Sequence, residues 1–416
     1  MKFDTYPISS AIKRNLSHAG FHRPTDIQYK AIPSILKGED VLAVAQTGTG
    51  KTAAFAIPVI NKIHSIKTSK RSRGIHCIVM VPTRELAGQI GRVFDSLAQR
   101  TKVKCFALYG GVEQDTQIKR LQDGIDVLVA TPGRMFDLIS QGAISTRYVS
   151  TLVLDEADQM LDKGFIKDIQ SIKRKLKQRH QTLFFSATIN KQIKKLAFSQ
   201  VKSSAIRIQV SPEDPVSKNV AHQVAFIEMD DKRFFLRSFI NANKGARVMV
   251  FVRTKVRAER VAKALERGGI DSLVLHGGKE QRERDLIMAD FRDEGGKILV
   301  ATDVSARGID VPGVDYVINY DLPEQAENYV HRVGRTGRGQ RKGQALSFCS
   351  TGEKELLKEI QAFLNKEIEV LKISKREYVD IIEDSDAPQD LREMILSHET
   401  REKEAWKKAR RKRRKK

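Results

Sequence analysis

The chain has 416 residues, of which 40% are hydrophobic and 30% charged, and its formal net charge is +23. This length predicts two domains with short extensions, because it exceeds the size of a typical single core. No apolar run approaches the roughly 18–20 residues that cross a bilayer, and residues 1–7 contain no apolar signal-peptide core. We therefore expect a cytoplasmic protein with no membrane partner.

The excess of positive charge extends beyond one segment. Residues 407–416 hold nine cations, which leaves +14 on the remainder. A basic body predicts a polyanionic partner, and nucleic acid fits better than an anionic membrane because no strongly apolar helix face accompanies the basic run. The basic run itself is interpreted either as a nucleic-acid tether or as a solvated, inert tail.

A candidate phosphate-binding loop follows the first apolar run, residues 41–44, and precedes the helix-forming residues 53–56. Glycines let backbone N–H groups converge on an anion, the helix N-terminus adds its dipole, and a lysine neutralises phosphate charge. The alternative is a Gly-Thr loop that serves only as a turn. The candidate nucleotide-binding residues of this loop are Ala45, Gln46, Thr47, Gly48, Thr49, Gly50, Lys51 and Thr52.

Short β-branched runs then alternate with stretches of helical period. The expected strands are 41–45, 75–81, 103–108, 126–130, 151–155, 181–185, 222–227, 247–252, 271–275, 297–301, 314–319 and 344–349. The expected helices include 84–99, 165–178, 255–267, 280–293 and a stretch near 353–366. This alternation predicts parallel sheets covered by helices on both faces, hence an α/β fold.

Three acids end the run from Thr151 to Asp158. Mg²⁺ prefers carboxylate oxygens, and a strand end beside a phosphate loop is a natural place to hold the metal of Mg-ATP. A solvated strand end is the alternative for these acids taken alone. Together with the loop they indicate an NTPase, with Thr52 and Asp155 as candidate metal ligands and Glu156 as a catalytic candidate.

Cys77, Cys105 and Cys349 each lie singly in an apolar stretch and lack metal-ligand spacing. We interpret them as core residues of a protein in a reducing compartment.

Two prolines and polar residues interrupt regular structure around residues 211–217, which predicts a linker. Beyond it, segment 331–341 carries four arginines among small residues. Such a run of charged residues usually forms a solvated surface. Here the glycines and the threonine between the arginines favour a close approach of the backbone to an anion. If the segment faced the nucleotide across the linker, Arg335 and Arg338 would act as arginine fingers.

These segments together resemble the DEAD-box RNA helicases. Asp155-Glu156-Ala157-Asp158 spells the family name, and the resemblance covers roughly residues 3–365 in the family's order. The amino-acid sequence of the N-terminal region is most similar to that of the bacterial RhlE-like branch. Further matching segments are 20–28, 82–87, 110–111, 131–134, 186–188, 250–252, 281–284, 301–310 and 331–341.

The resemblance implies two tandem RecA-like domains, at 1–210 and 220–370, joined by a linker at 211–219. We expect residues 371–416 to form a charged, disordered tail. The family also suggests roles for single residues. Asp310 would reach the ribose from the second domain, and Ser186, Thr188 and His331 would couple hydrolysis to strand opening, although a helix N-cap is a second explanation for Ser186 and Thr188.

Gln28 and Phe21 form the expected adenine site. The Gln28 amide donates and accepts together, which suits the edge of adenine. Phe21 offers a face for stacking, or else it is an ordinary core aromatic.

We expect the nucleic-acid surface to grip the sugar-phosphate backbone without sequence preference, because aromatic residues make up just 6% of the chain. The candidate RNA-binding residues are Pro82, Thr83, Arg84, Gly111, Thr131, Gly133, Arg134, Arg253, Gly277, Gln281, Arg284 and Thr302.

The sequence thus predicts a monomeric, RNA-stimulated ATPase and RNA helicase that uses ATP and Mg²⁺, with Lys51, Asp155, Glu156, Arg335 and Arg338 as its catalytic residues. Ribosomal or RNA-decay ribonucleoproteins are candidate partners. An ATP-gated RNA clamp is the competing class, and a DNA translocase is the third choice.

Overall fold

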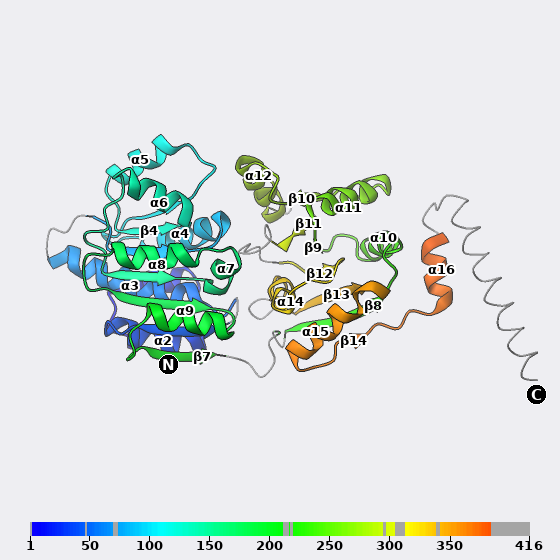
Figure 1. Cartoon of the computed structure of the whole chain (residues 1–416), viewed down its shortest axis with the longest axis horizontal. Helices are drawn as coiled ribbons and strands as arrows, with labels where there is room; N and C mark the ends of the chain where they lie inside the picture. The colour runs from blue at the N-terminus through cyan, green and yellow to red at the C-terminus, as the bar shows by residue number, and fades with distance from the viewer. Residues whose placement is uncertain are drawn as a thin grey trace, which may run out of the picture.

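The computed structural model describes residues 2–45, 48–69, 74–210, 216, 219–293, 297–303, 313–337 and 342–383. Within them the chain forms two domains, each built around a seven-stranded sheet. Figure 1 shows the first domain, blue to green, beside the second, green to orange. Side-chain contacts such as that between Glu85 and Arg284 join the two.

The first sheet has the strand order β3-β4-β2-β5-β6-β1-β7, and all its pairings are parallel. Its strands are β1 (Val41–Ala45), β2 (Cys77–Met80), β3 (Cys105–Leu108), β4 (Val127–Ala130), β5 (Thr151–Leu154), β6 (Gln181–Ser186) and β7 (Ile206–Val210). Its helices are η1 (Phe3–Thr5), α1 (Ser10–His18), α2 (Asp26–Leu36), α3 (Lys51–Ser69), α4 (Arg84–Ala98), α5 (Gln114–Gln122), α6 (Pro132–Ser140), α7 (Ala157–Asp162), α8 (Ile166–Lys175) and α9 (Lys191–Gln200).

The second sheet repeats this plan with the order β10-β11-β9-β12-β13-β8-β14, again parallel throughout. Its strands are β8 (Val220–Phe226), β9 (Val248–Val252), β10 (Leu273–Leu275), β11 (Ile298–Thr302), β12 (Tyr316–Asn319), β13 (Gly343–Cys349) and β14 (Glu369–Val370). Its helices are α10 (Lys232–Ala242), α11 (Lys255–Arg267), α12 (Gln281–Arg292), α14 (Ala326–Val333), η2 (Thr351–Glu353), α15 (Lys354–Leu364) and α16 (Lys375–Glu383).

Alternation along each central strand builds two cores per domain. In β2, Val79 packs into one hydrophobic cluster of the first domain, whereas Ile78 and Met80 pack into the other. A strand that is buried on both faces must read as a continuous apolar run, which is why the sequence pattern located these strands. The predicted fold class is confirmed.

Because its strands are parallel, the first sheet brings the functional segments together at the carboxyl ends of its strands. Val44 in β1 is opposite Ser186 in β6, and Leu154 in β5 is opposite Phe184 in β6. The carboxyl ends of these three strands therefore release the phosphate loop, the acids that follow Leu154, and the Ser186 segment side by side.

Each strand predicted from the sequence is present, and the strands β7 and β14 were missed. β7 alternates half-buried and exposed residues at a sheet edge, and β14 has two exposed residues. Edge strands such as these lack the continuous apolar run on which the prediction relied.

The prediction of a disordered tail beginning at residue 371 was wrong for its first part, because Lys375–Glu383 form α16, which packs on α10. The Tyr378 ring lies 4.7 Å from that of Phe235, and Ile382 is buried. This short apolar face is spaced among charged residues, so composition concealed it. Residues 384–416 lie outside the described part of the chain.

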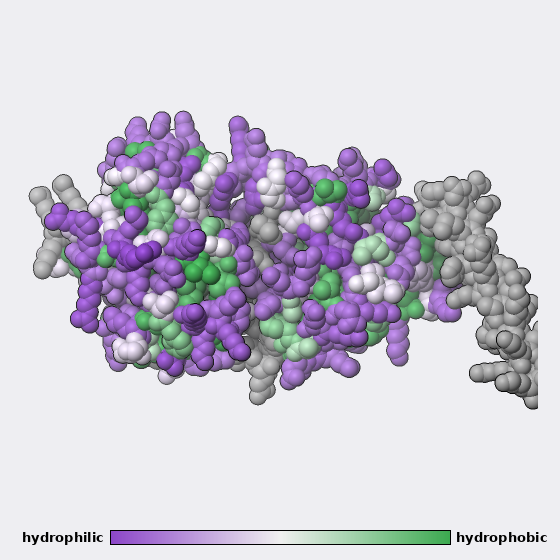
Figure 2. Space-filling model, in the orientation of Figure 1, coloured by the Kyte–Doolittle hydropathy of each residue, from purple (hydrophilic) through white to green (hydrophobic). Residues whose placement is uncertain are grey.

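The three cysteines are free and buried, as predicted, and burial raises the pKa of Cys77 to about 12. None of the helices in the described part of the chain is long and apolar enough to span a bilayer. The face shown in Figure 2 is mostly hydrophilic, with hydrophobic residues in small separate patches.

We expect Tyr378→Phe to lower the free energy of unfolding of the second domain by about 1 kcal/mol. Its hydroxyl donates to Asp231 Oδ2 at 2.7 Å and accepts from the Glu228 N–H at 3.1 Å, and the substitution removes both bonds. Urea unfolding measures the change, with the exposed Tyr148→Phe as the control. Equal midpoints for the two variants would contradict a docked α16.

Candidate nucleotide and nucleic-acid site

The phosphate loop lies between β1 and α3, as the sequence predicts. Ala45 ends the strand, and Lys51 and Thr52 begin the helix, while Gln46 and Thr47 lie outside the described residues. Gly50 has φ +90°, and a Cβ there would come within 2.4 Å of Gln28 Nε2. Only glycine fits this left-handed position against that neighbour.

Lys51 forms a buried ion pair with Glu156. The ammonium lies 3.1 Å from Oε1, and Gln159 Nε2 donates to Oε2 at 3.2 Å. Burial alone would raise the pKa of the Glu156 carboxyl, but Lys51, His331 and Arg335 outweigh it, so the pKa is lowered. Glu156 therefore carries its negative charge at neutral pH, held by donors at both oxygens.

Backbone strain accompanies this carboxylate. Glu156 has φ +53° and ψ +50° and is one of three non-glycine residues with positive φ in the described part of the chain. Such conformations cost free energy for a non-glycine residue and are concentrated at functional sites. The turn aims the carboxylate back at Lys51 instead of along α7.

Asp155 lies directly beside this pair. Its Oδ1 accepts a hydrogen bond from the Glu156 N–H at 3.0 Å, and burial, reinforced by Glu156 and Asp158, raises its pKa to about 7. Three buried carboxylates thus face one lysine, a negative excess that a divalent cation would offset. The described residues contain no cluster of three or more metal-binding side chains.

Asp158 links the acids to the segment after β6. Its Oδ2 accepts from the N–H groups of Ala187 and Thr188 and from Thr188 Oγ1, at 3.1, 2.9 and 3.0 Å. Ser186 Oγ donates to the Thr188 carbonyl at 2.8 Å. The N-cap explanation for Ser186 and Thr188 was wrong, because Asn190 caps α9.

Gln28 joins α2 to the phosphate loop. Its Oε1 accepts from the Thr25 N–H at 3.1 Å, and its Nε2 donates to the Gly50 carbonyl at 3.1 Å. Both ends of the amide already have protein partners, which the sequence did not show. Phe21 packs edge-on against Phe3, with centroids 6.4 Å apart, and is half-buried on the first-domain core. Phe21 is therefore in part a core residue.

The second domain brings cations to the first domain's acids. His331 and Arg335 are buried and close enough to Glu156 to lower its pKa. Arg335 Nε donates to the His331 carbonyl at 2.9 Å, which fixes the guanidinium. Arg332, in contrast, is locked inside the domain by Asp303. Arg338 and Asp310 lie outside the described residues.

A groove of about 360 Å³ crosses from one domain to the other. It contains nine of the residues predicted to bind RNA: Pro82, Thr83, Arg84, Thr131, Gly133, Arg134, Gly277, Gln281 and Arg284. Residues from helix starts and loops far apart in sequence therefore meet on one surface. Gly111, Thr302 and Arg253 are not among its lining residues.

Two contacts, which we call the interdomain bridge, hold the domains together beside this groove. Arg84 donates to Gln281 Oε1 at 3.2 Å, and Arg284 Nε donates to Glu85 Oε1 at 2.9 Å. Gly111 makes room for the first contact, since a Cβ there would meet Arg84 at 2.2 Å.

Arg253 has a different environment from the one expected. Its guanidinium donates to Glu353 at 3.0 Å, and Glu353 also pairs with the buried Lys232. This network lies at the carboxyl ends of the strands of the second sheet. Because its partners belong to its own domain, Arg253 does not line the groove.

Sequence reasoning missed several residues at these sites. Lys163, Phe165 and Lys279 line the groove, Glu85 completes the interdomain bridge, and Gln159 orients Glu156. Gln159 follows Glu156 by three residues on one helical turn, a spacing that could have identified it. The groove residues had no such signal, because pairing across domains leaves no trace in local spacing.

Two RecA-like domains in which an arginine of the second lies close to the acids beside the phosphate loop of the first are typical of nucleotide-driven helicases. Residues 25–196 match the DEAD/DEAH box helicase family, and residues 231–340 match the helicase conserved C-terminal domain. The chain belongs to the DEAD-box helicase family.

Known relatives agree with this assignment. The ATP-dependent RNA helicase DeaD of Buchnera aphidicola is 39% identical over 381 residues, covering 91% of this chain and 62% of DeaD. This chain thus spans under two thirds of that relative's length. CshA of Bacillus subtilis, a DEAD-box ATP-dependent RNA helicase, is 37% identical over 372 residues, covering 89% of this chain and 74% of CshA. These names support the family and leave the RhlE-like branch a prediction.

Among solved structures, Saccharomyces cerevisiae Dbp5 bound to RNA and ADP BeF3 matches with a TM-score of 0.82 at 29% identity. The match covers 92% of this chain and 98% of Dbp5. Both domains are therefore arranged in a similar way in the two proteins.

We call the arrangement in which the two domains are in contact the closed arrangement. We expect Glu85 and Arg284 to stabilise it jointly. Their side chains are 13% and 10% exposed, so the pair is only weakly screened. A double-mutant cycle with Glu85→Gln and Arg284→Gln should give a coupling of about 1 kcal/mol in RNA affinity, measured with a bound ATP analogue. Without nucleotide the coupling should vanish; strictly additive effects in both states would contradict the bridge.

Proposed function

We propose that this chain is an RNA-stimulated ATPase that opens or remodels short RNA duplexes. The observation that carries the proposal is the position of Glu156, held by Lys51 of the first domain and influenced by Arg335 of the second. A site completed only when two domains meet makes catalysis depend on whatever brings them together. The groove between the domains supplies a place where RNA would do so.

On the nucleotide side, the loop residues 45–50 would wrap the phosphates, and Lys51 would neutralise their charge. Thr52 and Asp155 would hold Mg²⁺, which would supply charge neutralisation to the transferring phosphoryl group. Glu156 would orient an attacking water and accept its proton. Gln28 and Phe21 would receive adenine, and Asp310 the ribose.

On the RNA side, the interdomain groove presents arginines, threonines and glycines and one half-buried aromatic, Phe165. Such a lining favours backbone contacts over base recognition, and contacts to 2′-hydroxyls would favour RNA over DNA. Lys163 and Lys279 add charge to the surface that the sequence predicted. Arg253, Gly111 and Thr302 would support it from outside the groove.

Coupling would run through Asp158. It joins the acids to Thr188 by three hydrogen bonds, so a shift of the acids on hydrolysis would reach the segment after β6. His331 and Arg335 would sense the same event from the second domain. The chain would act as a monomer in the cytoplasm on ribosomal or RNA-decay ribonucleoproteins.

ATP turnover with no polynucleotide, with single-stranded RNA and with DNA of equal length tests this function. We expect marked stimulation by RNA and little by DNA. Equal stimulation by both would favour a DNA translocase, and no stimulation would refute the proposal. Tight ATP-dependent RNA binding without opening of a blunt short duplex would instead identify an RNA clamp.

We expect Glu156→Gln to keep ATP and RNA bound while lowering turnover by at least about 10²-fold, because the amide keeps the shape but cannot accept a proton. Lys51→Ala should instead lose nucleotide affinity. Turnover and nucleotide binding, measured separately, distinguish the two variants. Normal turnover by Glu156→Gln would mean that another group activates the water.

Arg335→Ala should lower RNA-stimulated turnover by roughly 10³-fold, in the range of an arginine finger, with ATP affinity of the RNA-free chain nearly unchanged. The reason is that Arg335 approaches the acids from the opposite domain. Single-turnover hydrolysis measures the effect, and the exposed Arg267→Ala on α11 serves as control. Full activity of Arg335→Ala would remove the second domain from the catalytic site.

A further inference from the structure

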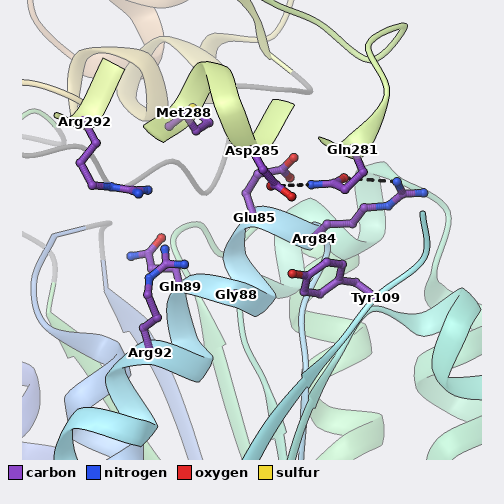
Figure 3. Close-up of a pocket in the computed structure, with 10 residues that line it drawn as sticks. All are labelled: Arg84, Glu85, Gly88, Gln89, Arg92, Tyr109, Gln281, Asp285, Met288 and Arg292. Atoms are coloured by element: carbon purple, nitrogen blue, oxygen red, sulfur yellow. Dashed lines mark hydrogen bonds between the residues drawn. The ribbon is translucent and has the colours of Figure 1, made fainter. Parts of the chain in front are cut away.

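A second cavity lies between the domains, on the other side of the interdomain bridge from the groove. It has a volume of about 220 Å³ and is walled by α4 of the first domain and α12 of the second. Both hollows share Arg84, Glu85 and Gln281, so the bridge forms the partition between them. We call this space the arginine cavity, after Arg84, Arg92 and Arg292 in its wall (Figure 3).

The acids of this cavity already have partners. Glu85 accepts from Arg284, and Asp285 Oδ1 accepts from Gln281 Nε2 at 3.0 Å. Neither carboxylate pairs with Arg92 or Arg292, and no other carboxylate of the described residues forms an ion pair with them. The charge of Glu85 is balanced by Arg284. The rest of the wall then carries three arginines and one acid, Asp285.

Arg92 and Arg292, the two arginines of the wall that lie outside the interdomain bridge, come from opposite domains. Figure 3 shows Arg292 extending from α12 and Arg92 from α4 toward one space, with the Gln89 amide beside them. The contact between the domains places both exposed arginines in the wall of one cavity. Guanidinium groups bind phosphate through paired N–H donors, so two facing guanidinium groups suit one phosphate-bearing ligand.

Neutral donors complete the wall. Burial, and then Asp285, raise the pKa of the Tyr109 phenol, so the hydroxyl keeps its proton at neutral pH and remains able to donate. The Gln89 amide adds two further N–H groups. The cavity therefore combines excess positive charge with a set of hydrogen-bond donors from both domains.

We propose that the arginine cavity binds a small phosphate-bearing anion, which links Arg92 to Arg292 and stabilises the closed arrangement. Two sources share this chemistry: a free polyphosphate and a phosphate of the RNA strand itself. The interdomain bridge separates the cavity from the groove, which favours the free anion. The proposed site depends only on the residues that line the cavity, whereas its effect on RNA release rests on the proposed function.

The test uses the full chain trapped with Mg-ADP-beryllium fluoride and fluorescent single-stranded RNA, which occupy the nucleotide and RNA sites. Inorganic pyrophosphate is added at constant ionic strength, and RNA dissociation is followed. We expect pyrophosphate to slow dissociation by about fivefold or more, a typical coupling between two sites, and R92Q/R292Q to abolish the response. The exposed pair R179Q/R267Q, one residue in each domain, removes the same charge elsewhere and should respond like the unmodified chain.

Equal responses of R92Q/R292Q and the unmodified chain would overturn the site. If R92Q/R292Q without pyrophosphate speeds release of a long RNA but not of one half its length, the bound phosphate belongs to RNA. Calorimetric titration of pyrophosphate into both chains reports binding directly. If no trapped RNA complex forms, the proposed function fails, and the calorimetric difference between the two chains still decides the cavity.

Discussion

The buried pair of Lys51 and Glu156 sets the charge balance on which the rest of the site depends. One ammonium faces the buried carboxyl groups of Asp155, Glu156 and Asp158, so the first domain alone supplies more acidic than basic groups at this place. Burying unbalanced charge is costly, and cations from elsewhere relieve the cost. His331 and Arg335 provide that relief from the second domain, and Mg²⁺ would provide it from solution.

The same principle explains why the two domains meet where they do. At the nucleotide edge, cations of the second domain approach acids of the first. At the groove, Arg284 of the second domain pairs with Glu85 of the first. Charges of opposite sign thus attract at two places, whereas at a third Arg92 and Arg292 line one cavity from opposite domains. The closed arrangement is a balance of these terms, and ligands at any of the three places would shift it.

The two sheets share one strand order, but the corresponding lysines of the two domains have different partners. Lys232 begins α10 after β8 just as Lys51 begins α3 after β1. Its ammonium, however, donates to the carbonyls of Tyr320 and Phe348 and to Glu353, which uses all three of its donors. In the proposed function, the second domain would therefore contribute arginines, and not this lysine, to the nucleotide site.

The amino-acid sequence by itself determined every strand except the edge strands β7 and β14, together with the phosphate loop and the acids after β5, because buried parallel strands and glycine turns leave local patterns. That Arg335 faces the nucleotide from the second domain stays a prediction. Only the tertiary structure decided which partners these groups have: Gln28 with Gly50, Asp158 with Thr188, and Arg253 with Glu353. It also showed α16 docked on α10 and placed Phe165 and Lys279 in one groove. These contacts form between residues that are far apart in the sequence. Local periodicity and spacing carry no information about such contacts.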